Sequence, residues 1–212
     1  MIDSEKAARD WVAKLPGIDA GAMGRLDHLV SLLGEENKRQ NLVSDTSLQA
    51  VWQRHVADSA QLVLHVPRET STWLDLGSGA GFPGLVIAAL QPGREVLMVE
   101  SRTARIDWLE RARLALSLGR AKVLGKRLEL VDSLGVGVIS ARAFAPLPRL
   151  LKLSARFSTS ETRWVLPKGR SAQQELDELH GWRHSFHVEQ SITDPQAGII
   201  VGELAGRKGK AS

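Results

Sequence analysis

The chain has 212 residues, 43% of them hydrophobic and 25% charged, which is enough to bury the core of one globular domain. It contains no cysteine, so disulfides, thiolate metal sites and mechanisms with a cysteine nucleophile are excluded. Residues 1–20 lack a secretory signal pattern, and no apolar run is long enough to span a membrane, so we expect a cytoplasmic protein. The net charge of +4 is compatible with a phosphate-rich partner, although many cytoplasmic enzymes carry a similar charge.

The first third of the chain is predicted to be helical, because its apolar residues recur every three to four positions. Two helices are separated by the break at Pro16-Gly17, and a third is expected over 47–65, where Pro67 ends it. The apolar positions that define the first two helices are Trp11, Val12, Leu15, Leu26, Leu29, Val30 and Leu33. We therefore expect residues 1–66 to form an N-terminal helical segment packed on the rest of the protein.

After Thr70, strand-like and helix-like segments alternate, which predicts a mostly parallel sheet covered on both faces. The last two strands follow each other without a helix, which predicts a terminal antiparallel hairpin. The expected strands are 72–76, 95–99, 121–124, 136–140, 162–166, a region around 184–188, and 199–204; the expected helices are 83–90, 103–118 and 147–156. These elements predict an α/β domain with a seven-stranded sheet over residues 67–206, followed by a basic tail over residues 207–212.

The strongest local signal is the sequence LDLGSGAGFPG over residues 74–84, which closes the first strand and opens a helix. Glycines at 77, 79 and 81 leave room for a ligand to lie against the backbone, where any Cβ would clash. Glu100 ends the second strand, where a carboxylate can accept hydrogen bonds from both ribose hydroxyls. Together these features predict a site for a cofactor that contains a nucleoside.

Two kinds of cofactor fit this pattern. Gly79, Gly81 and Gly84 spell the G-x-G-x-x-G of dinucleotide sites, which would indicate an NAD-linked dehydrogenase. The tighter Gly77-x-Gly79-x-Gly81 spacing and the acid at Asp75, expected to face the methionine part, favour S-adenosylmethionine. The chain has no tyrosine and no second nucleotide-binding half, which argues against the dehydrogenase. A methyltransferase of a small molecule or a protein, and a non-catalytic cofactor-binding protein, remain open at this point.

Five sequence blocks together resemble a known family. They are Asn37-x-x-x-Asn41-Leu42, Arg54-His55-x-x-Asp58-Ser59, the glycine loop, Glu100-Ser101 with Arg105, and Ser140-Ala141-Arg142-Ala143-Phe144-Ala145 with Lys168-Gly169 downstream. This set resembles the RsmG (GidB) family, whose members methylate N7 of one guanine in bacterial 16S ribosomal RNA. The resemblance implies a Rossmann-like class I methyltransferase fold, S-adenosylmethionine as cofactor, and 16S rRNA or the small ribosomal subunit as partner. We also expect a monomer that needs no metal.

The resemblance also implies roles for individual residues. Cofactor contacts are expected at Gly77, Phe82, Leu128, Glu129 and Arg142, with Glu100 on the ribose. Arg142 is expected at the junction of cofactor and substrate, where it binds either the methionine carboxylate or an RNA phosphate. Arg54 and His55 share one helical turn with Asp58, so they either contact the substrate or form a local polar network. Lys168 is expected on the RNA side.

The expected chemistry is undemanding. Guanine N7 carries a lone pair and no proton, so its methylation needs placement against the methyl donor and no general base. The position after the fourth strand reads Ser140-Ala141-Arg142-Ala143-Phe144 and lacks the N/D-P-P-Y/F motif of exocyclic-amine methyltransferases. Catalysis is therefore attributed to proximity, with Arg142 as the residue that places the reactants. Phe144 is expected either to stack on the target base or to belong to the core.

Overall fold

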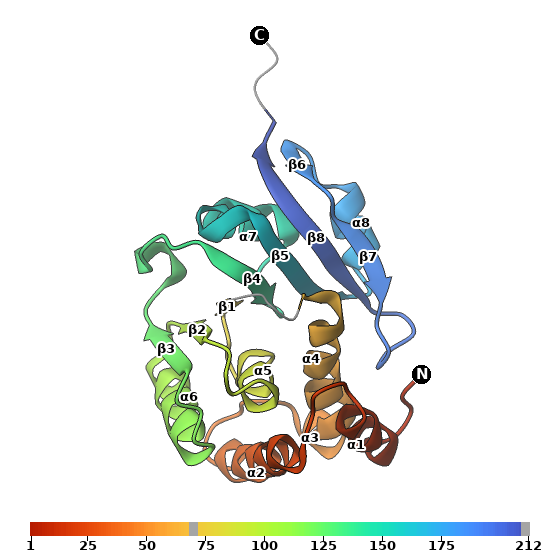
Figure 1. The fold of residues 1–212 in the computed structure, drawn as a ribbon, viewed down its shortest axis with the longest axis vertical. Coiled ribbons are helices and arrows are strands. Elements are labelled where there is room, and N and C mark those ends of the chain that lie inside the picture. The colour runs from red at the N-terminus through yellow and green to blue at the C-terminus, as the bar shows by residue number, and fades with distance from the viewer. Residues whose placement is uncertain (68–71, 209–212) are drawn as a thin grey trace.

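The computed structural model describes residues 1–67 and 72–208 of the chain. Its centre is an eight-stranded sheet in the order β3-β2-β1-β4-β5-β8-β6, with β7 also paired to β8 (Figure 1). The strands β1 to β5 are parallel, and β8 is antiparallel to its three neighbours. Their bounds are β1 (Trp73–Leu76), β2 (Val96–Glu100), β3 (Ala121–Gly125), β4 (Val136–Ala141), β5 (Ser158–Gly169), β6 (Trp182–His184), β7 (His187–Gln190) and β8 (Gly198–Arg207).

The prediction of seven strands is wrong by one, because the region around residues 184–188 forms two strands. Both β6 and β7 pair with β8, and the break between them lies opposite Gly202, where the backbone of Phe186 comes close. The Phe186 ring turns inward, stacks on His184 at 5.0 Å and meets Trp164 edge-on at 6.2 Å. Burial of this ring bends the chain, so one expected strand becomes two short ones. The expected antiparallel hairpin is present as β7 and β8.

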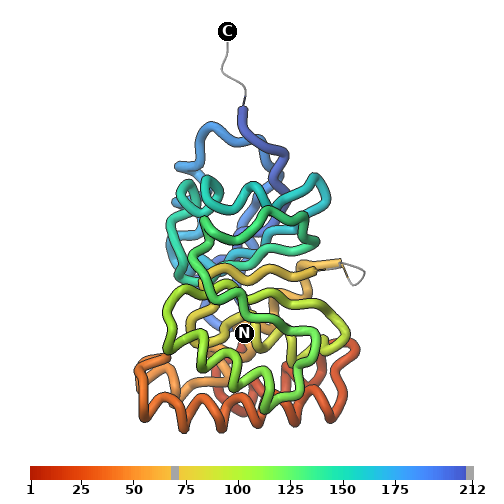
Figure 2. Tube along the Cα trace, turned by 90° about the vertical axis from the view of Figure 1, so that its left-hand side faces the viewer, coloured from red at the N-terminus to blue at the C-terminus, as the bar shows by residue number. Residues whose placement is uncertain are grey.

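Helices cover both faces of the sheet and create two apolar cores. One core joins the N-terminal helices and the two helices that follow β1 and β2; the other lies beneath the helices that follow β4 and β5 (Figures 1 and 2). The helices are α1 (Glu5–Ala13), α2 (Ala20–Asn37), α3 (Asp45–Gln49), α4 (Asp58–Ala60), α5 (Gly84–Leu90), α6 (Thr103–Ala115), α7 (Leu147–Ser154) and α8 (Ala172–Asp177). The short helix α8 was not predicted from the sequence. None of the described helices is both long and apolar enough to cross a membrane.

The N-terminal helices begin where the sequence supplies capping side chains. The Ser4 hydroxyl accepts the amide of Ala7, and the Asp19 carboxylate accepts the amide of Ala22 at 2.7 Å. The predicted third helix over 47–65 is divided into α3, the π-helix η1 (Trp52–Ala57), α4 and the 3₁₀ helix η2 (Gln61–His65). The N-terminal helices share one core with the sheet. For example, Leu26, Leu29 and Leu33 of α2 belong to the same cluster of buried residues as β1 and α5.

The predicted basic tail begins later than expected, since Arg207 is the last residue of β8. Its guanidinium lies 5.1 Å from the Trp182 ring, and the Lys208 amide donates to the Gly181 carbonyl. The rest of that prediction, residues 209–212, lies outside the described residues.

Because the N-terminal helices and the sheet share a core, we expect them to unfold together. Replacing fully buried Leu33 of α2 by alanine should lower the free energy of unfolding by about 2–5 kcal/mol. Replacing Leu114 of α6, which is 65% exposed, should change it by less than about 0.5 kcal/mol. Urea titrations followed by far-ultraviolet circular dichroism and by tryptophan fluorescence should give one coincident transition. Two separate transitions, with only the first shifted by Leu33→Ala, would contradict a shared core.

Candidate functional site

The glycine loop leaves the carboxyl end of β1 and leads into α5. Gly77 and Gly81 have φ angles of +68° and +100°, which side chains with a Cβ rarely adopt. A Cβ on Gly77 would lie 2.4 Å from Cδ2 of Phe144, and a Cβ on Gly81 would lie 2.4 Å from Cδ1 of Leu85. Both glycines are therefore required by conformation and by space.

Asp75 lies beneath this loop and is completely buried. Its Oδ1 accepts the Ser140 hydroxyl at 2.8 Å, and its Oδ2 accepts the Gly84 amide at 3.1 Å. The Trp73 indole N–H donates to the same Ser140 oxygen at 2.8 Å. Burial raises the pKa of the Asp75 carboxyl, against the hydrogen bonds that lower it. Asp75 lines neither of the two cavities described below and holds the loop in place through these hydrogen bonds, so its expected contact with the methionine part stays a prediction.

A cavity of about 300 Å³ lies beside the glycine loop, at the carboxyl ends of β1, β2 and β3. Gly77, Gly79, Glu100 and Leu128 all line it. The Glu100 carboxylate is fixed by three backbone amides, those of Gly79, Ser101 and Arg102, at 3.0, 2.7 and 2.9 Å. Of the roughly four lone pairs of a carboxylate, Oε1 uses two and Oε2 uses one, so one lone pair on Oε2 remains for a ribose hydroxyl.

Five of the nine predicted cofactor residues do not line this cavity; besides Asp75 they are Gly81, Phe82, Glu129 and Arg142, of which Arg142 lines the second cavity described below. The Glu129 side chain is exposed, although its neighbour Leu128 lines the wall. Phe82 is buried and points away from the cavity toward His55, on which its ring stacks at 4.8 Å.

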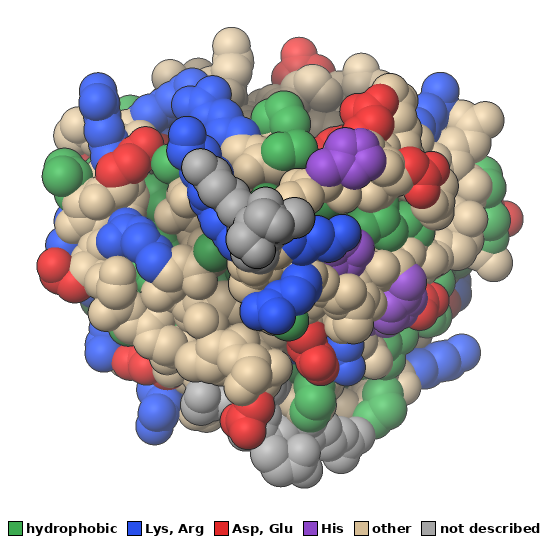
Figure 3. Space-filling model, turned by 90° about the horizontal axis from the view of Figure 1, so that it is seen from above, with side chains coloured by type: hydrophobic (Ala, Val, Ile, Leu, Met, Phe, Trp, Pro, Cys, Tyr) green, Lys and Arg blue, Asp and Glu red, His purple; other side chains and the backbone are tan. Residues whose placement is uncertain are grey.

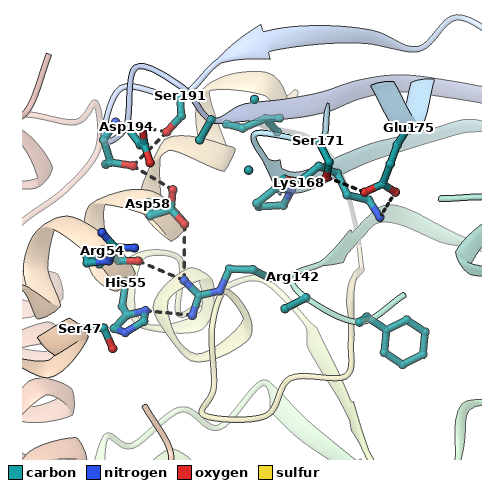
Figure 4. Close-up of a pocket in the computed structure, with 18 of the residues that line it drawn as sticks. Ser47, Arg54, His55, Asp58, Arg142, Lys168, Ser171, Glu175, Ser191 and Asp194 are labelled. Atoms are coloured by element: carbon teal, nitrogen blue, oxygen red, sulfur yellow. Dashed lines mark hydrogen bonds and ion pairs between the residues drawn. The ribbon is translucent and has the colours of Figure 1, made fainter. Parts of the chain in front are cut away.

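A second, larger cavity of about 680 Å³ adjoins the first. Its walls include Arg54, His55 and Asp58 from the N-terminal segment, and Arg142 from the loop after β4 (Figure 4). Ala143 and Phe144 line both cavities, so the two meet at this loop. Ala143 has a φ of +51°, an uncommon backbone conformation for a residue with a side chain, and such residues cluster at functional sites.

Arg142 is fixed by acceptors from one helical turn. Its Nη1 donates to the Arg54 carbonyl at 3.2 Å and faces the Asp58 carboxylate at 3.5 Å. Its Nη2 donates to Nδ1 of His55 at 3.0 Å, and its guanidinium lies 5.2 Å from the Phe82 ring. Burial lowers the pKa of Arg142, but a guanidinium stays charged in proteins. The predicted grouping of Arg54, His55 and Asp58 is therefore present, as a polar network around Arg142.

His55 is neutral at physiological pH. Burial, and then the positive charges of Arg142 and Arg54, lower its pKa to about 3. Since Nδ1 accepts from a guanidinium, the proton must sit on Nε2, which is buried and has no partner among the described residues. A buried donor left unpaired costs about 1–3 kcal/mol.

Lys168 does not serve as a free cation. Its side chain is 8% exposed, and Nζ donates to the Ala145 carbonyl at 2.7 Å and to the Glu175 carboxylate at 2.9 Å. Glu175 also accepts the Leu147 amide at 2.7 Å. Lys168 lines the larger cavity, but its contacts hold the loop 143–147 in place, so its predicted contact with an RNA phosphate finds no support in this geometry.

The Asn37 block links the N-terminal segment to the smaller cavity. Oδ1 of Asn37 accepts the amides of Leu42 and Val43 at 2.9 and 3.0 Å. The Asn41 carbonyl then accepts Nη2 of Arg105 at 3.0 Å, and Arg105 lines the cavity beside the glycine loop. This block therefore shapes the site from outside it.

Sequence reasoning missed the turn between β7 and β8. The Thr193 hydroxyl donates to Oδ1 of Asp58 at 3.0 Å, and Ser191, Thr193 and Asp194 line the larger cavity (Figure 4). Thr193 is 135 positions from Asp58 in the chain, so no local pattern connects them. Within the described part of the chain, no group of three or more His, Asp or Glu side chains is placed to bind a metal ion.

The strand order, the glycine loop after β1 and the acid after β2 define a Rossmann-like, class I S-adenosylmethionine-dependent methyltransferase fold. Solved structures with this fold include an S-adenosylmethionine-dependent methyltransferase from Aquifex aeolicus, with a TM-score of 0.58, 12% identity, and coverage of 82% of this chain and 97% of that one. The mitomycin 7-O-methyltransferase MmcR matches with a TM-score of 0.57 and 15% identity over 95% of this chain and 72% of that one.

The chain belongs to the GidB family, described as rRNA small subunit methyltransferase G, whose model matches residues 23–194. Curated relatives named ribosomal RNA small subunit methyltransferase G include that of Erythrobacter litoralis, which is 60% identical over 95% of this chain and 97% of the relative. That of Novosphingobium aromaticivorans is 56% identical over 97% of this chain and 90% of the relative. The family expected from the five sequence blocks is thereby confirmed.

The lowered pKa of His55 predicts a specific pH dependence of stability. Between pH 6.5 and pH 3 the unfolded chain binds a proton at His55 that the folded protein excludes, so stability falls as the pH falls. From pH 7.5 to pH 5, wild-type protein should lose about 2 kcal/mol more free energy of unfolding than His55→Asn. Urea titrations of both proteins at the two pH values measure this difference. Parallel losses would show that His55 titrates normally in the folded protein.

Proposed function

We propose that this protein transfers a methyl group from S-adenosylmethionine to N7 of a guanine in 16S ribosomal RNA. The observation that carries the proposal is membership of the rRNA small subunit methyltransferase G family over residues 23–194. The two adjoining cavities agree with it, because a group transfer needs one site for the donor and one for the acceptor.

The smaller cavity fits the nucleoside end of the cofactor. Gly77 and Gly79 leave the backbone open, Glu100 offers a fixed carboxylate for the ribose, and Leu128 supplies an apolar wall for the adenine. Arg142 stands in the larger cavity next to the junction, where it binds the methionine carboxylate. A ligand held at both ends would cross the junction of the two cavities, which Ala143 and Phe144 line. When bound, the cofactor supplies a methyl group whose bond to sulfur breaks as the guanine N7 lone pair forms the new N–C bond.

The residues at the junction match a reaction that moves no proton. His55 is neutral, and its only free nitrogen lone pair accepts from Arg142. The Asp58 carboxylate is occupied by Thr193, Gln61 and Arg142, and Lys168 is paired with Glu175. No described side chain at the junction is thus a free general base. The protein contributes placement and water exclusion, which are worth up to about 7–11 kcal/mol in favourable cases.

The larger cavity receives the target base, and exposed cations around it contact the RNA backbone. Arg54 is exposed at the wall of the larger cavity and Arg170 follows β5 beside it, whereas the exposed Arg127 follows β3, next to the partly exposed Lys126 that lines the smaller cavity. On the face seen from above, Lys and Arg side chains gather at the upper left and near the centre, and Asp and Glu side chains lie scattered over both halves (Figure 3). Phosphate contacts give affinity and salt dependence, whereas base choice depends on the cavity and on RNA shape.

The function is tested with labelled S-adenosylmethionine and small ribosomal subunits that lack the modification. After incubation, the RNA is digested and its nucleosides are analysed by mass. Label in 7-methylguanosine of 16S rRNA is the expected result. Cofactor binding without label in any nucleoside, on naked rRNA as well as on subunits, would reject the RNA substrate and leave a methyltransferase of another substrate.

Glu100 and Glu129 provide a matched pair for the cofactor site. Glu100→Gln should weaken binding of S-adenosylhomocysteine by about tenfold or more, because the carboxylate that holds both the loop and the ribose loses its charge. Glu129→Gln should leave the affinity unchanged, since its side chain is exposed and lies outside the cavity. Isothermal titration calorimetry measures both. Equal affinities for the two variants would place the nucleoside elsewhere.

A further inference from the structure

The π-helix η1 and the first residue of α4 together present three acceptors to one guanidinium. In a π-helix the backbone bonds join residues five apart, so the ladder is interrupted where it meets an α-helix, and such segments often occur at functional sites. Here the Arg54 carbonyl, Nδ1 of His55 and the carboxylate of Asp58, at the start of α4, all face Arg142 (Figure 4). The N-terminal segment therefore sets the position of a side chain that belongs to the loop after β4.

These contacts leave one edge of Arg142 free. The two hydrogens of Nη1 face the Arg54 carbonyl and Asp58, and one hydrogen of Nη2 faces His55. The Nε hydrogen and the second Nη2 hydrogen have no acceptor among residues 1–67 and 72–208. Elsewhere in the chain, Arg9 uses this same pair of nitrogens to bind both oxygens of Asp27, at 3.0 and 2.7 Å. The free edge of Arg142 thus has the geometry that a ligand carboxylate requires.

We propose that His55 is a positioning residue that orients Arg142, through its Nδ1 acceptor, so that the free edge of the guanidinium binds the carboxylate of the cofactor. This inference rests on the proposed function, because it assigns that carboxylate to S-adenosylmethionine. His55 itself does not touch the cofactor. It acts by accepting one Nη2 hydrogen, which fixes the direction of the other.

The surroundings of His55 match this positioning role. The residue is 9% exposed and its ring stacks on that of Phe82 in the glycine loop, with an angle of 15° between the two planes, so the imidazole plane is fixed. Its charged neighbours are Arg142 and Arg54, and both disfavour protonation, which keeps Nδ1 an acceptor. The buried Nε2–H, in contrast, has no partner in the described part of the chain. His55 therefore makes a hydrogen bond with Arg142 through Nδ1, while its Nε2–H stays without an acceptor among the described residues.

Two substitutions distinguish the effect of the Nδ1 acceptor from the effect of the aromatic ring. His55→Asn places Oδ1 where Nδ1 lies and keeps an acceptor for Arg142, whereas His55→Phe keeps the stack on Phe82 and removes the acceptor. His65→Asn, on the following helix η2 and outside both cavities, is the matched control. Affinities are measured by calorimetry for S-adenosylhomocysteine and for 5′-methylthioadenosine, which lacks the amino-acid carboxylate.

His55→Phe should bind S-adenosylhomocysteine about tenfold or more weakly, the loss expected for one hydrogen bond to a charged group, with 5′-methylthioadenosine unaffected. His55→Asn should retain most of the affinity, and His65→Asn all of it. Wild-type affinity for S-adenosylhomocysteine in His55→Phe would overturn the role of His55 while leaving the cofactor assignment intact. Equal weakening of both ligands would also overturn it, because the loss would then not depend on the carboxylate. If wild-type protein bound neither ligand, the proposed function would fail as well.

A measurement on the unmodified protein keeps the proposal testable if a variant does not fold. Long-range ¹H–¹⁵N spectra of histidine-labelled protein report the tautomer of each imidazole, and whichever of His55→Asn and His55→Phe folds assigns the His55 signal. The expected result is a neutral ring protonated at Nε2 from pH 5.5 to pH 8, with and without S-adenosylhomocysteine. A proton on Nδ1 would remove the acceptor and overturn the proposal.

Discussion

The cavity beside the glycine loop depends on one buried carboxylate. Asp75 has no exposed surface, and an ionised group in such a place is tolerated only when its oxygens are hydrogen-bonded. Its two oxygens bind the Ser140 hydroxyl and the Gly84 amide, so β1, β4 and the start of α5 are joined at a single point. The Trp73 indole extends this connection into the core. The glycine loop is consequently held from below, and its upper surface is left for a ligand.

The same connection determines where the second cavity lies. Ser140 precedes Arg142 by two residues on β4 and the loop that follows, so the bond that fixes Ser140 also fixes the start of that loop. Lys168 and Glu175 hold its other end through Ala145 and Leu147. Between these anchors, the ring of Phe144 lies against Gly77. The junction of the two cavities is thus supported on both sides by buried polar contacts.

Most of the fold and the motifs of the site could be predicted from the sequence, but few of the contacts between the site residues could. The strand and helix order was readable because apolar periodicity is local, and the five motif blocks predicted the family. The division of the third helix around a π turn, and the break between β6 and β7, depend on what Arg142 and Phe186 contact in three dimensions. The roles of Asp75 and Lys168 could not be predicted either: a charged residue beside a motif looks the same in sequence whether it faces a ligand or supports a loop. The wall formed by Thr193 gave no local signal at all.

The first residues of the chain support one wall of the larger cavity. The Ile2 amide donates to the Ile192 carbonyl at 2.9 Å, and the Gln53 side chain bridges the carbonyls of Ile2 and Thr193. The first residues therefore hold the β7–β8 turn in place. Thr193 of that turn donates to Asp58, which also faces Arg142. Fusing another protein to this end, or deleting residues 1 and 2, would therefore disturb the wall of the larger cavity, even though no residue of α1 lines it.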